Sequence, residues 1–370
     1  MQNASAIRGL AIKNQVPCTM EDREQVRGFL MHAVQSKIPP EKMRFDERIA
    51  KALGFIPEDY DYKEGLINLY LSQLGGYYDP EKKRYVMAGW LPEVMQPPVA
   101  VHELTHALQD QHYNLETFID DIHFSTDHLL ARAALVEGDA TAVMLDYQRG
   151  LMGQVPLSQV EQVDSFVLQT VLGMALSTSR DQVPESLKAA LLFPYASGIR
   201  FVHFLLRKSG YSEVSRAFKR PPETTEEILH PEKFNSRDAD YHIPSDRDFE
   251  IILATDKIVY SDTLGEFSIG ALLSGGAFNR ERAASAAIGW GGDRVVVAGK
   301  PGQERVIWQT LWDSSEDARE FFDSYREFLT EQGQGVKQSG EQRVTITVDS
   351  RSVMLELKDK MLMITVEFRK

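Results

Sequence analysis

One short segment of the chain carries side chains that could bind a metal ion and activate water. The segment 100-AVHELTHALQDQHYNL-115 contains His102 and His106 four residues apart. In an α-helix this spacing is a rotation of about 400°, so the two imidazoles lie about 40° apart on one face. Glu103 points to the flank, where its carboxylate can reach a water on the metal without binding the metal itself. The pattern therefore predicts two metal ligands and a general base.

A glutamate on a second helical segment is the expected third ligand. Glu137 lies in 134-ALVEGDATAVM-144, among alanines and Gly138, whose small size lets helix backbones approach closely. A carboxylate buried in such surroundings is costly unless it is paired or bound to a metal. Two alternatives remain open: this face is exposed on a surface helix, or Asp139 is the ligand instead. We expect Asp139 to accept a hydrogen bond from the free N–H of a ligand histidine and so fix its tautomer.

These motifs resemble those of the gluzincin group of zinc metallopeptidases, the thermolysin-like clan. The sequence is similar to an uncharacterised bacterial branch of this group in the motifs HELTHALQDQHY and ALVEGDATAVM, with GYYDP upstream and ILHPEKF downstream. The resemblance is specific over residues 76–149, extends less closely to residue 234, and does not cover the C-terminal part. It implies peptide-bond hydrolysis with Zn2+ held by His102, His106 and Glu137, a fourth position left for water, and Glu103 as general base.

The resemblance also implies an oxyanion donor and a strand that aligns the substrate. The clan places a Tyr or His downstream of the third ligand, and the candidates here are Tyr195, His230 and His203. We expect Tyr195 just before a helix start, where a loop residue could project into a cleft. Arg84–Ala88 is the expected edge strand for pairing with an extended peptide; the alternative is a plain surface hairpin.

The elements that must position these residues are mostly helices in the first 244 residues. Helical periodicity covers 21–35, 46–55, 63–73, 98–112, 126–149, 159–177, 184–192, 197–208 and 211–219, with a short helix within 221–234. A change of period indicates a hairpin over 76–90.

The pattern changes near residue 245. Strands are expected at 249–254, 294–299, 305–312, 343–348, 352–357 and 361–367, helices at 264–275, 280–287 and 314–332, and a loop at 333–340. The prediction is an α+β protein: a mainly helical zincin-type catalytic domain with a small edge hairpin, followed by a smaller α+β domain with antiparallel strands. The boundaries are 1–244 (N-terminal helices and hairpin 1–97, metal-binding helices 98–150, helical subdomain 151–244) and 245–370, a C-terminal domain of unknown role.

The composition of the chain excludes several classes of binding partner and of metal site. The net charge of −13 argues against nucleic acid and anionic membrane surfaces. The single cysteine, Cys18, excludes a zinc site built on paired cysteines. No apolar run approaches the roughly 20 residues that span a bilayer, and the first residues lack the pattern of a signal peptide. We therefore expect a cytoplasmic location, or a secreted one if a signal has been trimmed.

The expected partner is a peptide or protein substrate, with self-inhibition by an N- or C-terminal segment as a further possibility. The alternative to the peptidase is a catalytically inactive metal-binding or scaffold protein on the same fold.

Overall fold

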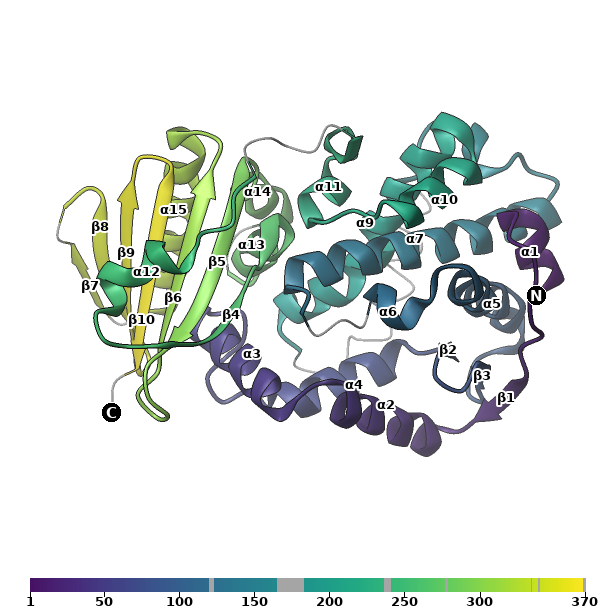
Figure 1. The fold of residues 1–370 in the computed structure, drawn as a ribbon, viewed down its shortest axis with the longest axis horizontal. Coiled ribbons are helices and arrows are strands. Elements are labelled where there is room, and N and C mark those ends of the chain that lie inside the picture. The colour runs from purple at the N-terminus through teal and green to yellow at the C-terminus, as the bar shows by residue number, and fades with distance from the viewer. Residues whose placement is uncertain are drawn as a thin grey trace.

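A computed structural model describes residues 1–119, 123–164, 183–235, 241–276, 279–333, 335–338 and 340–368. It has the α+β architecture that the sequence predicts, with a helical part and a part built on an antiparallel sheet (Figure 1). We call the described residues of 1–37 and 62–235 the helical region. The sheet region comprises helix α3 (Pro40–Leu53) and the described residues of 241–368.

The helical region carries all the predicted site residues. Its helices are α1 (Gln2–Arg8), α2 (Arg23–Lys37), α4 (Tyr62–Gln73), α5 (Gln96–Tyr113), α6 (Leu115–Ile119), α7 (Thr126–Leu151), α9 (Glu185–Ser209), α10 (Tyr211–Lys219) and α11 (Thr225–Leu229), with single 3₁₀ turns at Glu93–Met95, Leu157–Gln159 and Lys233–Asn235. A small sheet has the order β1 (Cys18–Glu21), β3 (Arg84–Ala88), β2 (Gly76–Asp79). Strand β1 runs parallel to β3, and β2 runs antiparallel to it.

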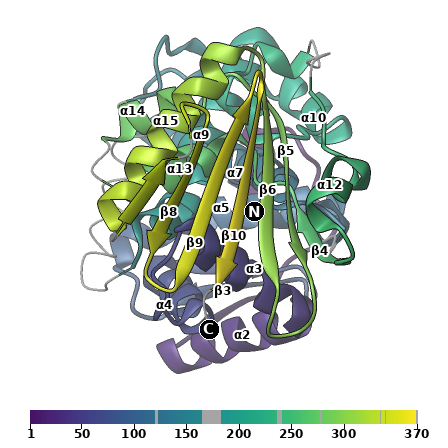
Figure 2. The same ribbon diagram turned by 90° about the vertical axis from the view of Figure 1, so that its left-hand side faces the viewer.

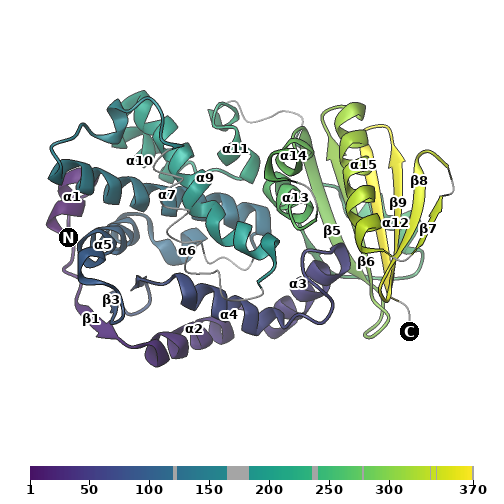
Figure 3. The same ribbon diagram turned by 180° about the vertical axis from the view of Figure 1, so that it is seen from behind.

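The two helices with the metal-site motifs have clear start and stop signals. Helix α5 has prolines in its first turn, where the missing N–H costs nothing, and it ends at Asn114 with a left-handed φ of 54°. Helix α7 is capped by Ser125, whose side chain accepts from the N–H of His128. Helix α7 packs against both α5 and α9 (Figures 1 and 3).

The sheet region is built on seven antiparallel strands among the residues described. Their order is β4 (Ile258–Asp262), β5 (Trp290–Ala298), β6 (Arg305–Trp312), β10 (Met361–Phe368), β9 (Arg351–Lys358), β8 (Arg343–Val348) and β7 (Gly335–Gln338) (Figure 2). One face is covered by α13 (Gly265–Leu273), α14 (Arg280–Ser285) and α15 (Ser315–Gln332), and the other by α12 (Asp246–Leu253).

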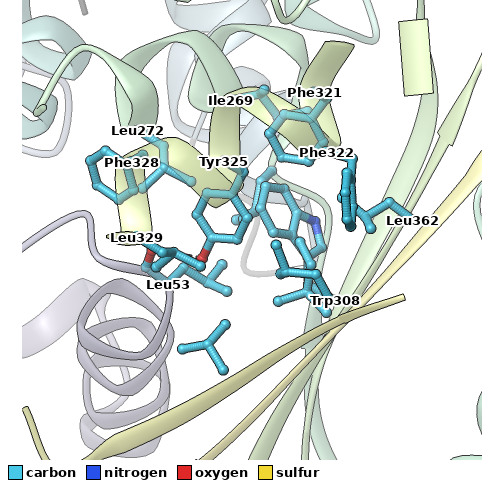
Figure 4. Close-up of a cluster of buried hydrophobic side chains, with 14 of the residues drawn as sticks. Leu53, Ile269, Leu272, Trp308, Phe321, Phe322, Tyr325, Phe328, Leu329 and Leu362 are labelled. Atoms are coloured by element: carbon cyan, nitrogen blue, oxygen red, sulfur yellow. Dashed lines mark hydrogen bonds between the residues drawn. The ribbon is translucent and has the colours of Figure 1, made fainter. Parts of the chain in front are cut away.

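Helix α3 belongs to the sheet region, whereas the predicted domain boundary put it in the catalytic domain. Its Phe45, Ile49 and Leu53 are buried in the same hydrophobic core as Trp308 and the aromatic residues of α15. Figure 4 shows Leu53 beside Tyr325 and Leu329 of α15. The hydroxyl of Tyr325 also donates to the carbonyl of Leu53 at 2.9 Å. A boundary at residue 244/245 therefore misses an N-terminal contribution to the sheet region.

Three local predictions are wrong, and one lies partly outside the described residues. Residues 249–254 belong to helix α12, not to a strand, and part of the expected loop at 333–340 is strand β7. The two helices expected at 184–192 and 197–208 are one helix, α9, which continues through Pro194. For the expected helix 159–177, residues 165–177 are not among those described, and residues 157–159 form a 3₁₀ turn.

Among the described residues, α9 alone is long and apolar enough, by length and composition, to cross a membrane. Half of its most apolar window is buried inside the protein, against α7 in particular. Core helices commonly meet the same criterion, so this finding is weak evidence for a membrane span.

Candidate metal centre

Three side chains from α5 and α7 converge on one point. The Nε2 atoms of His102 and His106 are 3.1 Å apart, and Oε2 of Glu137 lies 3.1 Å from the first and 3.4 Å from the second. The two imidazole rings are almost perpendicular, at 87°. Both histidines are buried, and the Glu137 side chain is 22% exposed. Among the described residues these three form the one group of His, Cys, Asp and Glu side chains arranged so that it could hold a metal ion.

The spacing of the three atoms fits a small tetrahedral ion. Ligands about 2.05 Å from a tetrahedral zinc are about 3.3 Å from one another, close to the three distances here. Two imidazole nitrogens and one carboxylate oxygen are also a donor set that zinc accepts. The residues present therefore fit Zn2+ or another divalent ion of similar size.

The tautomer of His106 is set by a residue one helical turn further along α5. Gln109 directs its Nε2 to two acceptors, the carbonyl of Val136 at 3.0 Å and Oδ2 of Asp139 at 2.9 Å. Its Oε1 must then face Nδ1 of His106, which lies 2.8 Å away. An oxygen at that position accepts a hydrogen bond, so Nδ1 carries the proton. The lone pair of Nε2 is left free to bind the metal.

The predicted general base is held from the small sheet. Oε2 of Glu103 accepts the backbone N–H of Tyr78 on β2 at 2.9 Å. The same β2–α5 contact is extended by the Tyr78 hydroxyl, which donates to Asp110 at 2.8 Å. Burial raises the pKa of Glu103, the charge of Glu137 raises it further, and the two histidines act in the opposite direction. A carboxyl with a raised pKa is a stronger base than an exposed one.

Tyr195 reaches the site because α7 and α9 cross at two glycines. A Cβ on Gly138 would come within 2.2 Å of the Gly198 carbonyl oxygen, and a Cβ on Gly198 within 2.2 Å of the carbonyl oxygen of Ala134. The small residues of 134-ALVEGDATAVM-144 thus do allow close approach, chiefly to α9. The ring of Tyr195, one turn before Gly198, stacks over His102 with centroids 6.2 Å apart.

The hydroxyl of Tyr195 is also near the third ligand. Burial raises the pKa of Tyr195 well above its ordinary value, and Glu137, Glu103 and a hydrogen bond to Glu137 raise it further. The phenol therefore stays protonated at neutral pH and is available as a hydrogen-bond donor. Its backbone position differs from the expectation, because Tyr195 lies inside α9 and not in a loop.

The histidines and the glutamate of the ligand cluster shift one another's pKa values. Burial lowers the pKa of His106, but Glu137 and its hydrogen bonds outweigh burial and raise that pKa to about 9. Burial raises the pKa of Glu137, and the two histidines lower it by more, to below the ordinary range. Without a metal, the site thus holds an ion pair between His106 and Glu137. A bound cation would take the place of the proton on the imidazole.

Two other oxyanion candidates are held elsewhere. Nε2 of His230 lies 2.8 Å from Oε1 of Glu266 on α13, and His203 bonds to the carbonyl of Val160 at 2.9 Å. Neither hydrogen bond involves a residue of the metal-site cluster. His203 is therefore a buried side chain that is hydrogen-bonded within the core.

Two further expectations about the surroundings are corrected. Asp139 does not bond directly to a ligand histidine; it bonds to Gln109, which bonds to His106. Strand β3 (Arg84–Ala88) is not an edge strand, because it is paired on one side with β2 and on the other with β1. A substrate cannot add to β3 while β1 is in place.

The sequence patterns missed two residues near the centre. Gln109 continues the i, i+3 and i+4 face of the HELTH motif, so the spacing His106–Gln109 could have revealed it. Tyr70 on α4 is 47% exposed as a residue. Burial of its phenol and the charge of Glu137 raise the pKa of Tyr70. Tyr70 in turn contributes to the raised pKa of Tyr195. It has no local motif, since only the fold brings α4 to this side of α9.

Comparison with known proteins adds one match. Residues 255–366 match the model of a domain of unknown function, DUF8575. This range lies entirely in the sheet region, from β4 to β10, and includes none of the metal-centre residues. No curated protein and no solved structure matches the chain.

Proposed function

We propose that this protein is a zinc-dependent peptidase of the gluzincin type, with the metal held by His102, His106 and Glu137. The observation that supports this most directly is the triangle of two ring nitrogens and one carboxylate oxygen, with sides of 3.1 to 3.4 Å. The protonation of His106 at Nδ1, imposed by Gln109, leaves the nitrogen that faces the triangle free to act as a ligand.

When bound, zinc supplies Lewis acidity that activates water and polarises the scissile carbonyl. Glu103 takes a proton from the attacking water and delivers it to the leaving amine. Its bond from the Tyr78 N–H occupies Oε2, which leaves Oε1 for that proton. Tyr195 is the proposed oxyanion donor, because its ring stacks over His102 and its phenol stays protonated beside Glu137.

The test compares zinc content and casein hydrolysis in the parent protein and three variants of α5. We expect Glu103→Gln to retain zinc and lose about 10²- to 10⁴-fold in hydrolysis, the usual contribution of a general base. We expect His106→Ala to lose zinc and activity together. His112→Ala is the matched control, because His112 is on the same helix but bonds to the carbonyl of Ala11 at the surface.

The outcomes separate the peptidase from its alternative. Zinc retained with undiminished hydrolysis in Glu103→Gln would remove Glu103 from the mechanism. Zinc bound by the parent, with no hydrolysis of casein or of a mixed peptide library, would favour an inactive metal-binding or scaffold protein. Absence of zinc binding by the parent would end the proposal.

A further inference from the structure

The N-terminal helix α1 places an arginine in the interior of the helical region. Arg8 is 1% exposed, and its Nε lies 2.6 and 2.8 Å from the two carboxylate oxygens of Asp139, which is fully buried. Its Nη1 donates to Oγ of Ser215 on α10 at 2.9 Å. Burial lowers the pKa of Arg8, but Asp139 raises it by more, so the guanidinium stays charged. Residues 131 positions apart thus form an ion pair that excludes water.

That ion pair is two hydrogen bonds away from the metal centre. Oδ2 of Asp139 accepts from the amide nitrogen of Gln109, and the oxygen of the same amide faces Nδ1 of His106. The chain Arg8–Asp139–Gln109–His106 connects helices α1, α7 and α5 without a solvent-exposed member. Each link has a definite direction, because a guanidinium only donates, a carboxylate accepts, and the amide has one end for each.

The orientation of the Gln109 amide decides which nitrogen of His106 can bind a metal. If the amide turned over, its NH₂ would face Nδ1, and the ring proton would have to move to Nε2, the atom that faces Glu137. Two acceptors hold the amide in place, the Val136 carbonyl and the Asp139 carboxylate. The carboxylate keeps its position because Nε of Arg8 donates to its Oδ2 and lies within ion-pair distance of its Oδ1.

The segment after α1 is also fastened to α5. Lys13 bonds through its backbone N–H and its Nζ to Gln111, and the Ala11 carbonyl bonds to His112. Helix α1 packs through Ala4 against Val101 and Leu108 of α5 and Val143 of α7. The N-terminal residues are therefore built into the support of the metal-binding helices.

We propose that Arg8 is a positioning residue for the metal centre: through Asp139 and Gln109 it keeps His106 in the tautomer that binds the ion. This inference rests on the metal site of the proposed function, but not on peptidase activity. Loss of groups that orient metal ligands typically costs about 10- to 100-fold in metal affinity. We expect Arg8→Met to weaken the binding of Zn2+ by that factor.

The experiment measures the dissociation constant of Zn2+ alone by competition with a chromophoric chelator, and the thermal midpoint of the metal-free protein. The variants are Arg8→Met, Arg8→Lys, Gln109→Met and the double variant Arg8→Met/Gln109→Met. If Arg8 acts through Gln109, Arg8→Met weakens binding in the parent but adds nothing in the Gln109→Met background. Arg8→Lys keeps the charge with fewer donors and should give an intermediate affinity.

Arg351→Met is the matched control. Arg351 is equally buried, at 3% exposure, but it bonds to the carbonyls of Lys51 and Ala52 in the sheet region. Its replacement should lower the thermal midpoint and leave the affinity for Zn2+ unchanged. If Arg8→Met behaves in this same way, or if its effect multiplies with that of Gln109→Met, the positioning role is overturned.

Three further outcomes complete the test. If Arg8→Met does not fold, Arg8→Lys with and without Gln109→Met gives the same comparison. If the parent binds Zn2+ but cleaves no peptide, the proposed function fails and the role of Arg8 still stands or falls on the affinities. If the parent binds no Zn2+, both are overturned.

Discussion

The helical region and the sheet region both bury carboxylates, yet they use them in opposite ways. Asp293 on β5 accepts four N–H donors: the backbones of Leu264 and Gly265 and the indoles of Trp290 and Trp308, at 2.8 to 3.1 Å. Glu137 faces the Nε2 atoms of His102 and His106, and the three atoms are arranged so that they could share a metal ion.

The difference shows that burial of an acid does not mark a reactive site. Burial raises the pKa of Asp293, and its four hydrogen bonds only partly offset this. Its partners are donors fixed by the fold, so the group is saturated and joins β5 to β6 and to the start of α13. The partners of Glu137 are the two histidines that we propose share a metal ion with it. The chemistry of the neighbours, more than the cost of burial, distinguishes a structural carboxylate from a ligand.

The largest expected effect that tests this contrast comes from Asp293→Ala. It leaves four buried N–H groups without an acceptor, and we expect a loss of about 3–5 kcal/mol in the free energy of unfolding. Urea unfolding of the sheet region, followed by tryptophan fluorescence, measures it. The affinity for Zn2+ should not change. A variant with weaker zinc binding and unaltered unfolding would break the distinction between the two regions.

Local patterns were sufficient to predict how the candidate site residues of α5 are arranged. His102, Glu103 and His106 lie on one helix, so a single period predicts their geometry, and the start and stop signals of α5 and α7 are close in sequence. The α+β class also follows from the change of period near residue 245. What these signals have in common is that a few neighbouring residues carry them.

Long-range pairing could not be predicted in this way. The Arg8–Asp139 pair and the place of α3 in the sheet region depend on contacts between residues more than a hundred positions apart. Residues 249–254 have high β propensity, which suggested a strand. They are helical because Ser245 and Asp248 form a capping box that starts α12. Pro194 suggested a break in a helix that tertiary packing keeps continuous.

The next largest effect comes from a comparison of two tyrosines, Tyr195 in the helical region and Tyr325 in the sheet region. If Tyr195 stabilises the oxyanion, Tyr195→Phe should lower kcat by about 100-fold with zinc content unchanged. Tyr325→Phe in the sheet region removes a hydroxyl that donates to the Leu53 carbonyl, and should cost about 1 kcal/mol of stability with no change in kcat. Steady-state kinetics and thermal unfolding measure both.

An undiminished kcat in Tyr195→Phe would assign this tyrosine to packing alone. Tyr70 would then be the next residue to replace, because Glu137 also raises its pKa. A loss of zinc in Tyr195→Phe would instead mean that the phenol supports Glu137, and not the substrate.

The smallest expected effect lies where the two regions meet. Asp262, the last residue of β4, accepts from the backbone N–H of Thr126 at 2.8 Å and from its hydroxyl at 2.6 Å, and thereby joins the sheet region to the start of α7. Burial is the main cause that raises its pKa from 3.8 to about 6, against the hydrogen bonds from Thr126. Folding therefore favours the protonated form.

The sign of the pH dependence follows from that shift. The stability contributed by protonated Asp262 is fully present below about pH 4 and is lost as the pH rises through about 6. We expect this group to cost the parent about 1–3 kcal/mol between pH 4 and pH 7. Asp262→Asn should remove that part of the dependence, because its amide oxygen can accept from the backbone N–H groups of Thr126 and Thr263 and its NH₂ can donate to the Thr126 hydroxyl.

Asp248 provides a control of opposite sign, because hydrogen bonds from Ser245 lower its pKa at an exposed position. Its contribution is present above its ordinary pKa of 3.8 and is lost as the pH falls below it. Asp248→Asn should therefore lower the stability at neutral pH, and should change the slope of stability against pH only at the acidic end. Unfolding free energies of the parent and both variants, measured from pH 3 to pH 8, give the three curves. If the parent and Asp262→Asn curves stay parallel across pH 4 to 7, then the Asp262 carboxyl is solvated in the folded protein as it is in the unfolded chain. The contact between β4 and α7 would then be looser than the hydrogen bonds from Thr126 require.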